Sequence, residues 1–213
     1  MSVIHEIMAT GPLEVNCQII SGKGSGEAVL IDPGGDAERI LGRLKKMGLK
    51  LTHIINTHGH FDHIGAVAEL KEASGCQFWL HKADLALVKD AARHASSWGL
   101  PFGPIPGVDK FIKDGEKLEV AGLTLGVIHT PGHTPGGVCL RWNKQVAVGD
   151  TLFAGSVGRT DLPGGDMETL VESIINKLVP QGDDLQCHPG HGPSTNLGHE
   201  KKTNPFINGG GFY

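Results

Sequence analysis

The chain has 213 residues and a formal net charge of -4, and 39% of its residues are hydrophobic while 20% are charged. This composition is that of a globular protein, and no apolar run approaches the roughly 20 residues of a membrane helix, so disordered, fibrous and membrane-spanning chains are excluded. The acidic balance, without a long run of Lys or Arg, argues against nucleic acid or a membrane as partner and favours a small-molecule substrate.

The length fits one well-buried core, so we expect a single domain over residues 1–213. The N-terminus shows no secretory signal, which predicts a cytoplasmic protein. The four cysteines are widely spaced and form no CxxC pair, so we expect buried free thiols. Nothing in the sequence indicates the oligomeric state.

In chain order, short runs rich in Val, Ile and Leu predict β-strands, with helical patterns between them. Strands are expected at residues 3–9, 16–21, 27–32, 51–56, 76–81, 123–129, 137–142, 145–149 and 184–187. Helices are expected at residues 36–48, 63–75 and 167–179, the first of them capped by Asp36. Residues 98–107 form a long loop, either a lid near the site or an ordinary connection. The pattern predicts a mixed α/β domain.

Four expected strands end in polar turns that carry His or Asp. Functional residues of α/β proteins usually lie on loops at strand ends, so these turns can converge on one rim. Glycine or proline beside each candidate lets the backbone turn tightly. The turns are "THGHFDH" (57–63), "TPGHTPGG" (130–137), Asp150 after "QVAVG", and "HPGHGP" (188–193).

Together the turns offer the nitrogen and oxygen ligands His58, His60, Asp62, His63, His133, Asp150 and His191. A structural zinc takes four ligands and usually includes Cys, so this larger set predicts two divalent metal ions. His58 and His60 form a pair, because residues two apart in an extended segment point to the same side. Asp62 and His63 would face the second metal, and Asp150 would bridge. Zn is the first expectation, and the ligands also suit Fe or Mn.

The motifs "HGHFDH", "PGHTPG", "GDTLF" and "CHPGHGP", in this order, resemble those of the metallo-β-lactamase superfamily. Within it, the chain is most similar to the short, single-domain form of the glyoxalase II group. The resemblance implies an αββα sandwich, in which two mixed sheets pack face to face with helices outside. It also implies two ligand sets joined by Asp150: His58, His60 and His133 for one metal, and Asp62, His63 and His191 for the other.

The implied reaction is hydrolysis of a thioester or an ester. Two metals lower the pKa of a shared water from about 15.7 towards roughly 7, so hydroxide becomes available to attack the acyl carbonyl. Asp62 and Asp150 are the expected catalytic carboxylates. No general acid is obvious in the motifs, which favours a thioester, because a thiol with a pKa of about 8.5 is a good leaving group.

The longer enzymes of the glyoxalase II group have a helical C-terminal domain that binds glutathione, and the expectation here is that no such domain follows. In "SVGRTD" (156–161), Arg159 matches a glutathione-binding Lys of those enzymes in charge, while Asp161 replaces a Tyr. The thiol carrier is therefore left open. Arg159 is the candidate for binding a substrate carboxylate, because its planar guanidinium suits that geometry.

Two alternatives stand beside the hydrolase. Persulfide dioxygenases of the same superfamily carry a similar "GRTD" stretch and would hold one iron through His58, His133 and Asp150. A non-catalytic metal-binding scaffold is the other, but such a protein should have lost ligands. The second ligand set, closed by His191, favours the hydrolase. The other histidines are expected to be structural: His5, His53, His81, His94, His129, His188 and His199.

Overall fold

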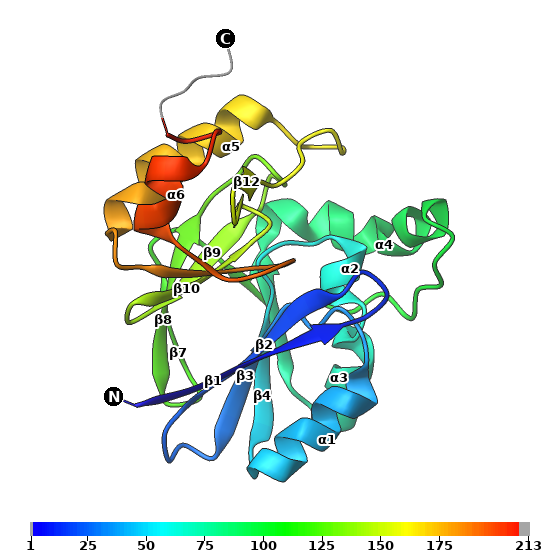
Figure 1. The fold of residues 1–213 in the computed structure, drawn as a ribbon. Coiled ribbons are helices and arrows are strands. Elements are labelled where there is room, and N and C mark those ends of the chain that lie inside the picture. Colours follow the sequence, from blue (N-terminus) through cyan, green and yellow to red (C-terminus); the bar gives the residue numbers. More distant parts are fainter. Residues whose placement is uncertain (1, 209–213) are drawn as a thin grey trace.

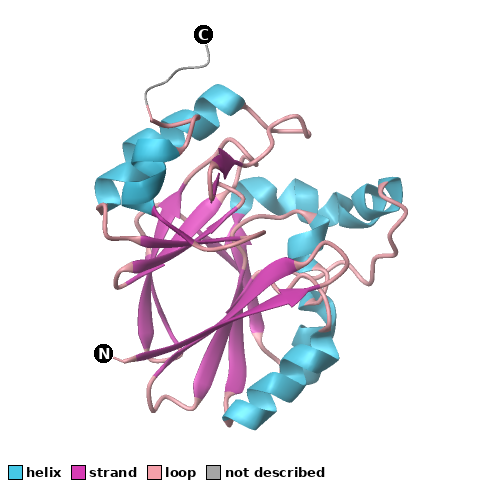
Figure 2. Ribbon diagram, in the orientation of Figure 1, coloured by secondary structure: helices cyan, strands magenta, loops and turns pink. Residues whose placement is uncertain are grey.

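A computed structural model describes residues 2–208 of the chain. Two six-stranded mixed β-sheets pack face to face, and helices cover both outer faces (Figures 1 and 2). The predicted αββα sandwich is confirmed. No helix among residues 2–208 is long and apolar enough to cross a membrane.

The first sheet has the strand order β1-β2-β3-β4-β5-β6. Its first three strands are antiparallel, and β3 to β6 run parallel because helices cross over between them. Strands β3 and β5 are buried on both faces over most of their length, which explains why they read as nearly continuous apolar runs. The bounds are β1 Val3–Thr10, β2 Val15–Gly22, β3 Glu27–Ile31, β4 Lys50–Ile55, β5 Gln77–His81 and β6 Lys110–Ile112, with helices α1 Ala37–Met47, α2 Phe61–Ile64, α3 Val67–Ser74, 3-10 helix η1 Lys82–Asp84 and α4 Leu85–Ser97.

The second sheet has the order β14-β13-β10-β9-β8-β7. Its neighbours are antiparallel except β10 and β13, whose connection carries helix α5. The bounds are β7 Lys117–Val120, β8 Leu123–His129, β9 Val138–Trp142, β10 Gln145–Gly149, β13 Gln186–Pro189 and β14 Thr195–Asn196, with the hairpin β11 Leu152–Phe153 and β12 Ser156–Val157, then α5 Met167–Ser173, π-helical η2 Ile174–Leu178, 3-10 helix η3 Val179–Gln181 and α6 Leu197–Thr203.

Three apolar layers stabilise this arrangement. Ile55 and Trp79 of the first sheet meet Leu125 and Leu140 of the second between the sheets. Separate clusters join the first sheet to α1, α3 and α4, and the second sheet to α5 and α6. Each fully buried Leu or Ile stabilises the fold by roughly 1.5–3 kcal/mol before entropy is counted. All four cysteines are buried and free, as predicted.

The helix predicted at residues 63–75 is wrong in its continuity, because the structure has two helices, α2 and α3. The Ala66 N–H donates to the Pro33 carbonyl (3.0 Å). A Cβ on Gly65 would lie 2.2 Å from the Gly34 carbonyl oxygen, so the chain needs glycine where it passes this turn. Contact with the neighbouring turn therefore breaks the helix.

Other boundaries also differ from the prediction. Asp36 precedes α1 in a left-handed conformation (φ 58°) and makes no side-chain cap. Its carboxylate instead accepts a hydrogen bond from the Gly11 N–H (3.2 Å). The helix predicted at 167–179 changes from α to π geometry at Ile174. Helix α4 was missed, since its buried face includes small residues such as Ala91 and Ala95 and gives a weak apolar pattern.

Candidate metal centre

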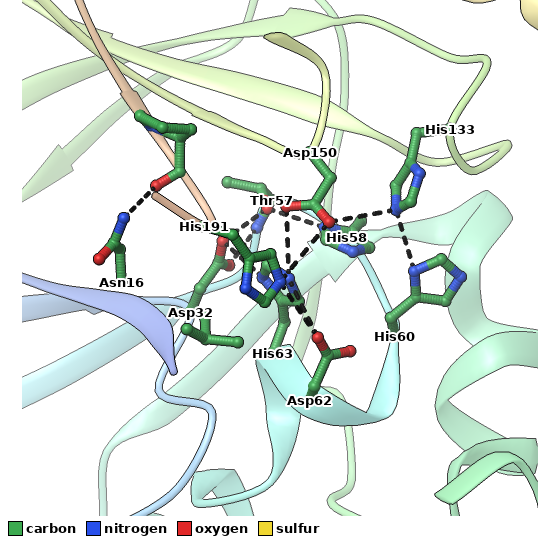
Figure 3. A network of polar contacts seen from close by, with 12 residues as sticks. Asn16, Asp32, Thr57, His58, His60, Asp62, His63, His133, Asp150 and His191 are labelled. Atoms are coloured by element: carbon green, nitrogen blue, oxygen red, sulfur yellow. Dashed lines mark hydrogen bonds and ion pairs between the residues drawn. The ribbon is translucent and has the colours of Figure 1, made fainter. Parts of the chain in front are cut away.

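The predicted ligand residues lie together at one edge of the sandwich, where strands of both sheets end (Figure 3). His58 and His60 follow β4, and the short helix α2 carries Asp62 and His63. The remaining three follow β8, β10 and β13 and are His133, Asp150 and His191. Strand ends far apart in sequence thus converge on one rim.

Three sets of three residues have potential ligand atoms within 4.8 Å of one another. One of them, Asp32, His58 and His63, overlaps the two main sets, which are His58, His60 and His133 in one, and Asp62, His63 and His191 in the other. Asp150 lies between them, with Oδ1 at 3.5 Å from His63 Nε2 and Oδ2 at 3.6 Å from His133 Nε2. The structure brings together the sets that the family resemblance implied. That each member binds a metal stays a prediction.

Asp32 fixes the orientation of two of these imidazoles. Its carboxylate accepts hydrogen bonds from the Thr57 hydroxyl (2.6 Å) and from His63 Nδ1 (3.1 Å). Since Thr57 gives its only hydroxyl proton to Asp32, it must accept from His58 Nδ1 (3.0 Å). Both rings therefore carry a proton on Nδ1 and turn Nε2 towards the centre. Hydrogen-bond partners commonly fix metal-binding histidines in this way.

Backbone carbonyls orient two more of the imidazoles. His133 Nδ1 donates to the Arg159 carbonyl (2.7 Å), and His191 Nδ1 donates to the Leu13 carbonyl (3.1 Å). His60 differs, because its Nδ1 is the atom that approaches His133 Nε2 (3.0 Å). Four of the five imidazoles, those of His58, His63, His133 and His191, are therefore held in place by a hydrogen bond at Nδ1.

The polar atoms at this centre fit metal ions. Within the described part of the chain, His58 Nε2, His63 Nε2 and Asp150 Oδ1 are buried and have no hydrogen-bond partner. Leaving a polar group buried and unpaired costs roughly 1–3 kcal/mol, and native proteins avoid it unless a ligand completes the site. Three such atoms converging on one centre fit a site that binds cations.

Electrostatics also favour cations here. Burial, reinforced by the neighbouring imidazoles, lowers the pKa of His58 well below its usual value and that of His60 to about 3, so these rings stay neutral and keep a lone pair. Burial also lowers the pKa of His63, but the carboxylates of Asp150, Asp62 and Asp32 outweigh it and raise that pKa well above normal. Without a metal, a protonated His63 compensates the carboxylates.

Sequence reasoning missed Asp32 and a second buried carboxylate, Asp84. Asp84 accepts hydrogen bonds from the Gly59 N–H (2.9 Å), the Thr134 hydroxyl (2.8 Å) and the Gly136 N–H (2.6 Å), and so joins the two loops that carry His58 and His133. The sequence could have identified Asp32, because this residue follows a strand in "IDPGGD", as the ligand residues follow theirs. Asp84 lies in a 3-10 turn with no motif around it.

A cavity of about 480 Å³ opens above the centre. His60, Asp62, His133, Asp150 and His191 form its polar part, and Leu13, Phe61, Trp98, Phe153, Val157 and Leu162 form most of its apolar wall. Arg159 lines the cavity, as its predicted role requires. His94 was expected to be structural, but it lines the cavity too, with its ring 5.6 Å from that of His60.

The loop predicted at residues 98–107 borders the cavity through Trp98, and Leu100 and Phe102 line a neighbouring cavity of about 400 Å³. Two other histidines pack against neighbouring rings, in keeping with the structural role expected for them. His53 packs against Trp79 with 4.6 Å between ring centroids, and His129 stacks on His81 at 4.2 Å.

Known proteins share this architecture. The chain is 40% identical over 212 residues to the hydroxyacylglutathione hydrolase GloC of Haemophilus influenzae, covering 95% of this chain and 97% of that protein. The BLEG-1 B3 metallo-beta-lactamase superposes with a TM-score of 0.90 at 36% identity, covering 97% of this chain and 100% of the other. TTHA1623 in a di-iron-bound form superposes with a TM-score of 0.88 at 41% identity, covering 95% and 100%. The family model of the metallo-beta-lactamase superfamily matches residues 10–191, and the chain belongs to this superfamily.

Proposed function

We propose that the protein hydrolyses thioesters, or esters, with two divalent metal ions. The observation that carries the proposal is the pair of ligand sets with Asp150 between them, which contains buried unpaired atoms on His58, His63 and Asp150. His58, His60 and His133 would hold one ion, Asp62, His63 and His191 the other, and Asp150 would contact both. When bound, such ions make water acidic near neutral pH and polarise a carbonyl oxygen.

The chain's own residues supply positioning around that chemistry. Asp62 lines the cavity floor, and His191 and His63 keep its carboxylate ionised: burial raises its pKa, but these imidazoles outweigh burial and lower it. It can therefore orient a water molecule and accept its proton. The apolar wall excludes bulk water from the carbonyl and strengthens electrostatic interactions. A thiolate leaves without a strong acid, since its pKa is about 8.5.

The relatives support this class of reaction. GloC is named a hydroxyacylglutathione hydrolase and shares 40% identity with this chain, so lactoylglutathione is the first substrate to test. The di-iron form of TTHA1623 supports a two-metal centre and makes iron a candidate beside zinc and manganese. We propose that the protein works in the cytoplasm on a small-molecule thioester, without a nucleic acid or membrane partner.

A persulfide dioxygenase would need one iron, held by His58, His133 and Asp150. That arrangement leaves the second ligand set, Asp62, His63 and His191, without a metal, whereas two metals use both sets. Metal analysis of protein purified without chelators separates the two reactions. Two metal ions per chain support the hydrolase, and one iron per chain with an empty second set supports the dioxygenase.

Asp150→Ala tests the assignment directly. Loss of the carboxylate between both sets should abolish two-metal binding and thioester hydrolysis together. Asp184→Ala is a matched control, since this exposed carboxylate pairs with Lys144 at the surface. Asp150→Ala protein that turns over at near wild-type rate would refute the bridging role.

A further inference from the structure

The cavity wall above the metal centre carries one Lys or Arg side chain among the described residues, Arg159. Around it the wall is apolar and aromatic. Trp98 remains 47% exposed beside the guanidinium, whose central carbon lies 6.0 Å from the Trp98 ring centroid. A substrate anion that binds to this wall, away from the metal ions, would thus meet one cationic side chain, Arg159.

Arg159 already forms an ion pair with Asp161. Arg159 Nε donates to Asp161 Oδ1 and Arg159 Nη2 donates to Oδ2, each at 2.7 Å. This bidentate geometry uses two N–H groups through which arginine binds a carboxylate most strongly. The backbone of Arg159 is fixed as well, because its carbonyl accepts the hydrogen bond from His133 Nδ1 (2.7 Å). The guanidinium and its carboxylate together present little net charge.

We propose that Asp161 is a specificity-determining residue: by engaging Arg159, it makes the cavity favour thioesters with an uncharged thiol portion over anionic ones such as glutathione thioesters. This inference rests on the proposed thioesterase function. An anionic substrate must displace Asp161 from Arg159 or approach beside its negative charge. An uncharged substrate does neither and gains contact with the apolar wall formed by Trp98, Phe153 and Leu162.

The expected size of the effect follows from the exposure of the pair. The side chains of Arg159 and Asp161 are 48% and 67% exposed. Water therefore screens their attraction, and exposed pairs of this kind change an equilibrium by up to roughly fivefold. Asp161 should bias selection between substrates rather than determine whether hydrolysis occurs.

The test uses two thioesters with the same lactoyl group, one on glutathione and one on uncharged N-acetylcysteamine. In metal-loaded Asp161→Asn, the ratio of kcat/KM for the glutathione ester to that for the uncharged ester should rise roughly two- to fivefold, mainly through KM. The same substitution in an Arg159→Gln background should leave the ratio unchanged, because the freed guanidinium is then absent. Asp90→Asn is the matched control, since Asp90 pairs with Arg93 on α4 and does not line the cavity.

A binding measurement separates this inference from the proposed function. Calorimetry with S-methylglutathione, which is not hydrolysed, should show a Kd lowered by the same factor in Asp161→Asn. Unchanged Kd and unchanged ratio, or an equal change without Arg159, would overturn the role of Asp161. Wild-type protein that hydrolyses neither thioester would overturn the proposed function, while the Kd comparison would still report on Asp161.

Discussion

Gly190 lies in the turn before His191, and its replacement by alanine should disable the metal centre. A Cβ on this residue would lie 2.3 Å from Asp150 Oδ1 and 2.5 Å from His63 Cε1. The backbone of Gly190 is not in the left-handed region, so alanine causes no conformational strain there. The collision with two ligand residues is therefore the whole perturbation.

Neither ligand residue can move away freely. His63 is buried and tied through Nδ1 to Asp32, and a Cβ on Gly158 would lie 1.8 Å from the Asp150 carbonyl, which shows how tightly this segment is packed. Ordinary contact begins near 3.4 Å, so the Asp150 carboxylate must shift by about 1 Å. We expect metal affinity to fall roughly 10- to 100-fold, as it does when outer partners of metal ligands are removed. Activity should fall about 100-fold.

The assay is metal content by mass spectrometry after removal and readdition of zinc, with metal affinity from competition against a chelator. Gly192→Ala is the matched control, since Gly192 has φ +73° but nothing within 4 Å of its Cβ position. That variant should lose about 1–2 kcal/mol of stability through backbone strain and keep both metals. If Gly190→Ala binds two metals within twofold of wild-type affinity, the packing argument is wrong.

Three further predictions concern Asp32, His188 and the four cysteines. Asp32→Asn should weaken metal binding roughly 10- to 100-fold in chelator competition, and unchanged affinity would contradict this. Asp32 accepts from the Thr57 N–H with Oδ1 and from the Thr57 hydroxyl and His63 Nδ1 with Oδ2, whereas an amide has only one accepting oxygen. Burial, reinforced by a neighbouring imidazole, lowers the pKa of His188 to about 4, so the unfolded state takes up this proton first on acidification. As the pH falls from about 6.5 to 4, this group should therefore lower the free energy of unfolding by up to about 1.4 kcal/mol per pH unit. Urea titrations across this range should show a smaller loss of stability for His188→Gln than for the wild type. The four cysteines are buried, and burial raises the pKa of Cys139 to about 11, so a thiol reagent at pH 8 should label none in the folded protein and all after denaturation.

The candidate ligands could be predicted because they cluster in short motifs at strand ends. There the ligand residue and the residues that form the turn are neighbours in the sequence. Asp84 could not, because it reaches Gly59 and Gly136 from a separate segment and only the packed fold brings them together. Arg159 shows an intermediate case. Its place in the cavity wall was predictable, whereas its pairing with Asp161 depended on side-chain geometry.

Secondary structure could likewise be predicted where local sequence determines it, and not where tertiary contacts do. Strands with continuous apolar runs were predicted well, since burial on both faces leaves a strong local pattern. The helix predicted at 63–75 was wrong because tertiary contact between Gly65 and Gly34 overrides local helical preference. Helix α4 buries small residues such as Ala91 and Ala95, so the sequence showed little contrast between its faces.

Different parts of the fold determine the metal chemistry and the substrate preference of this chain. The ligand side chains are held by outer partners such as Asp32 and by carbonyls such as that of Leu13, and these interactions depend on the shared sandwich. The wall of the cavity comes from the end of α4 and from the segment after β12, where Trp98, Arg159 and Asp161 meet. The side chains of those segments can vary while the Arg159 carbonyl keeps its hydrogen bond to His133, because function is carried by sites built on a common fold. The side chains around Arg159 are therefore where this chain's substrate preference should be tested.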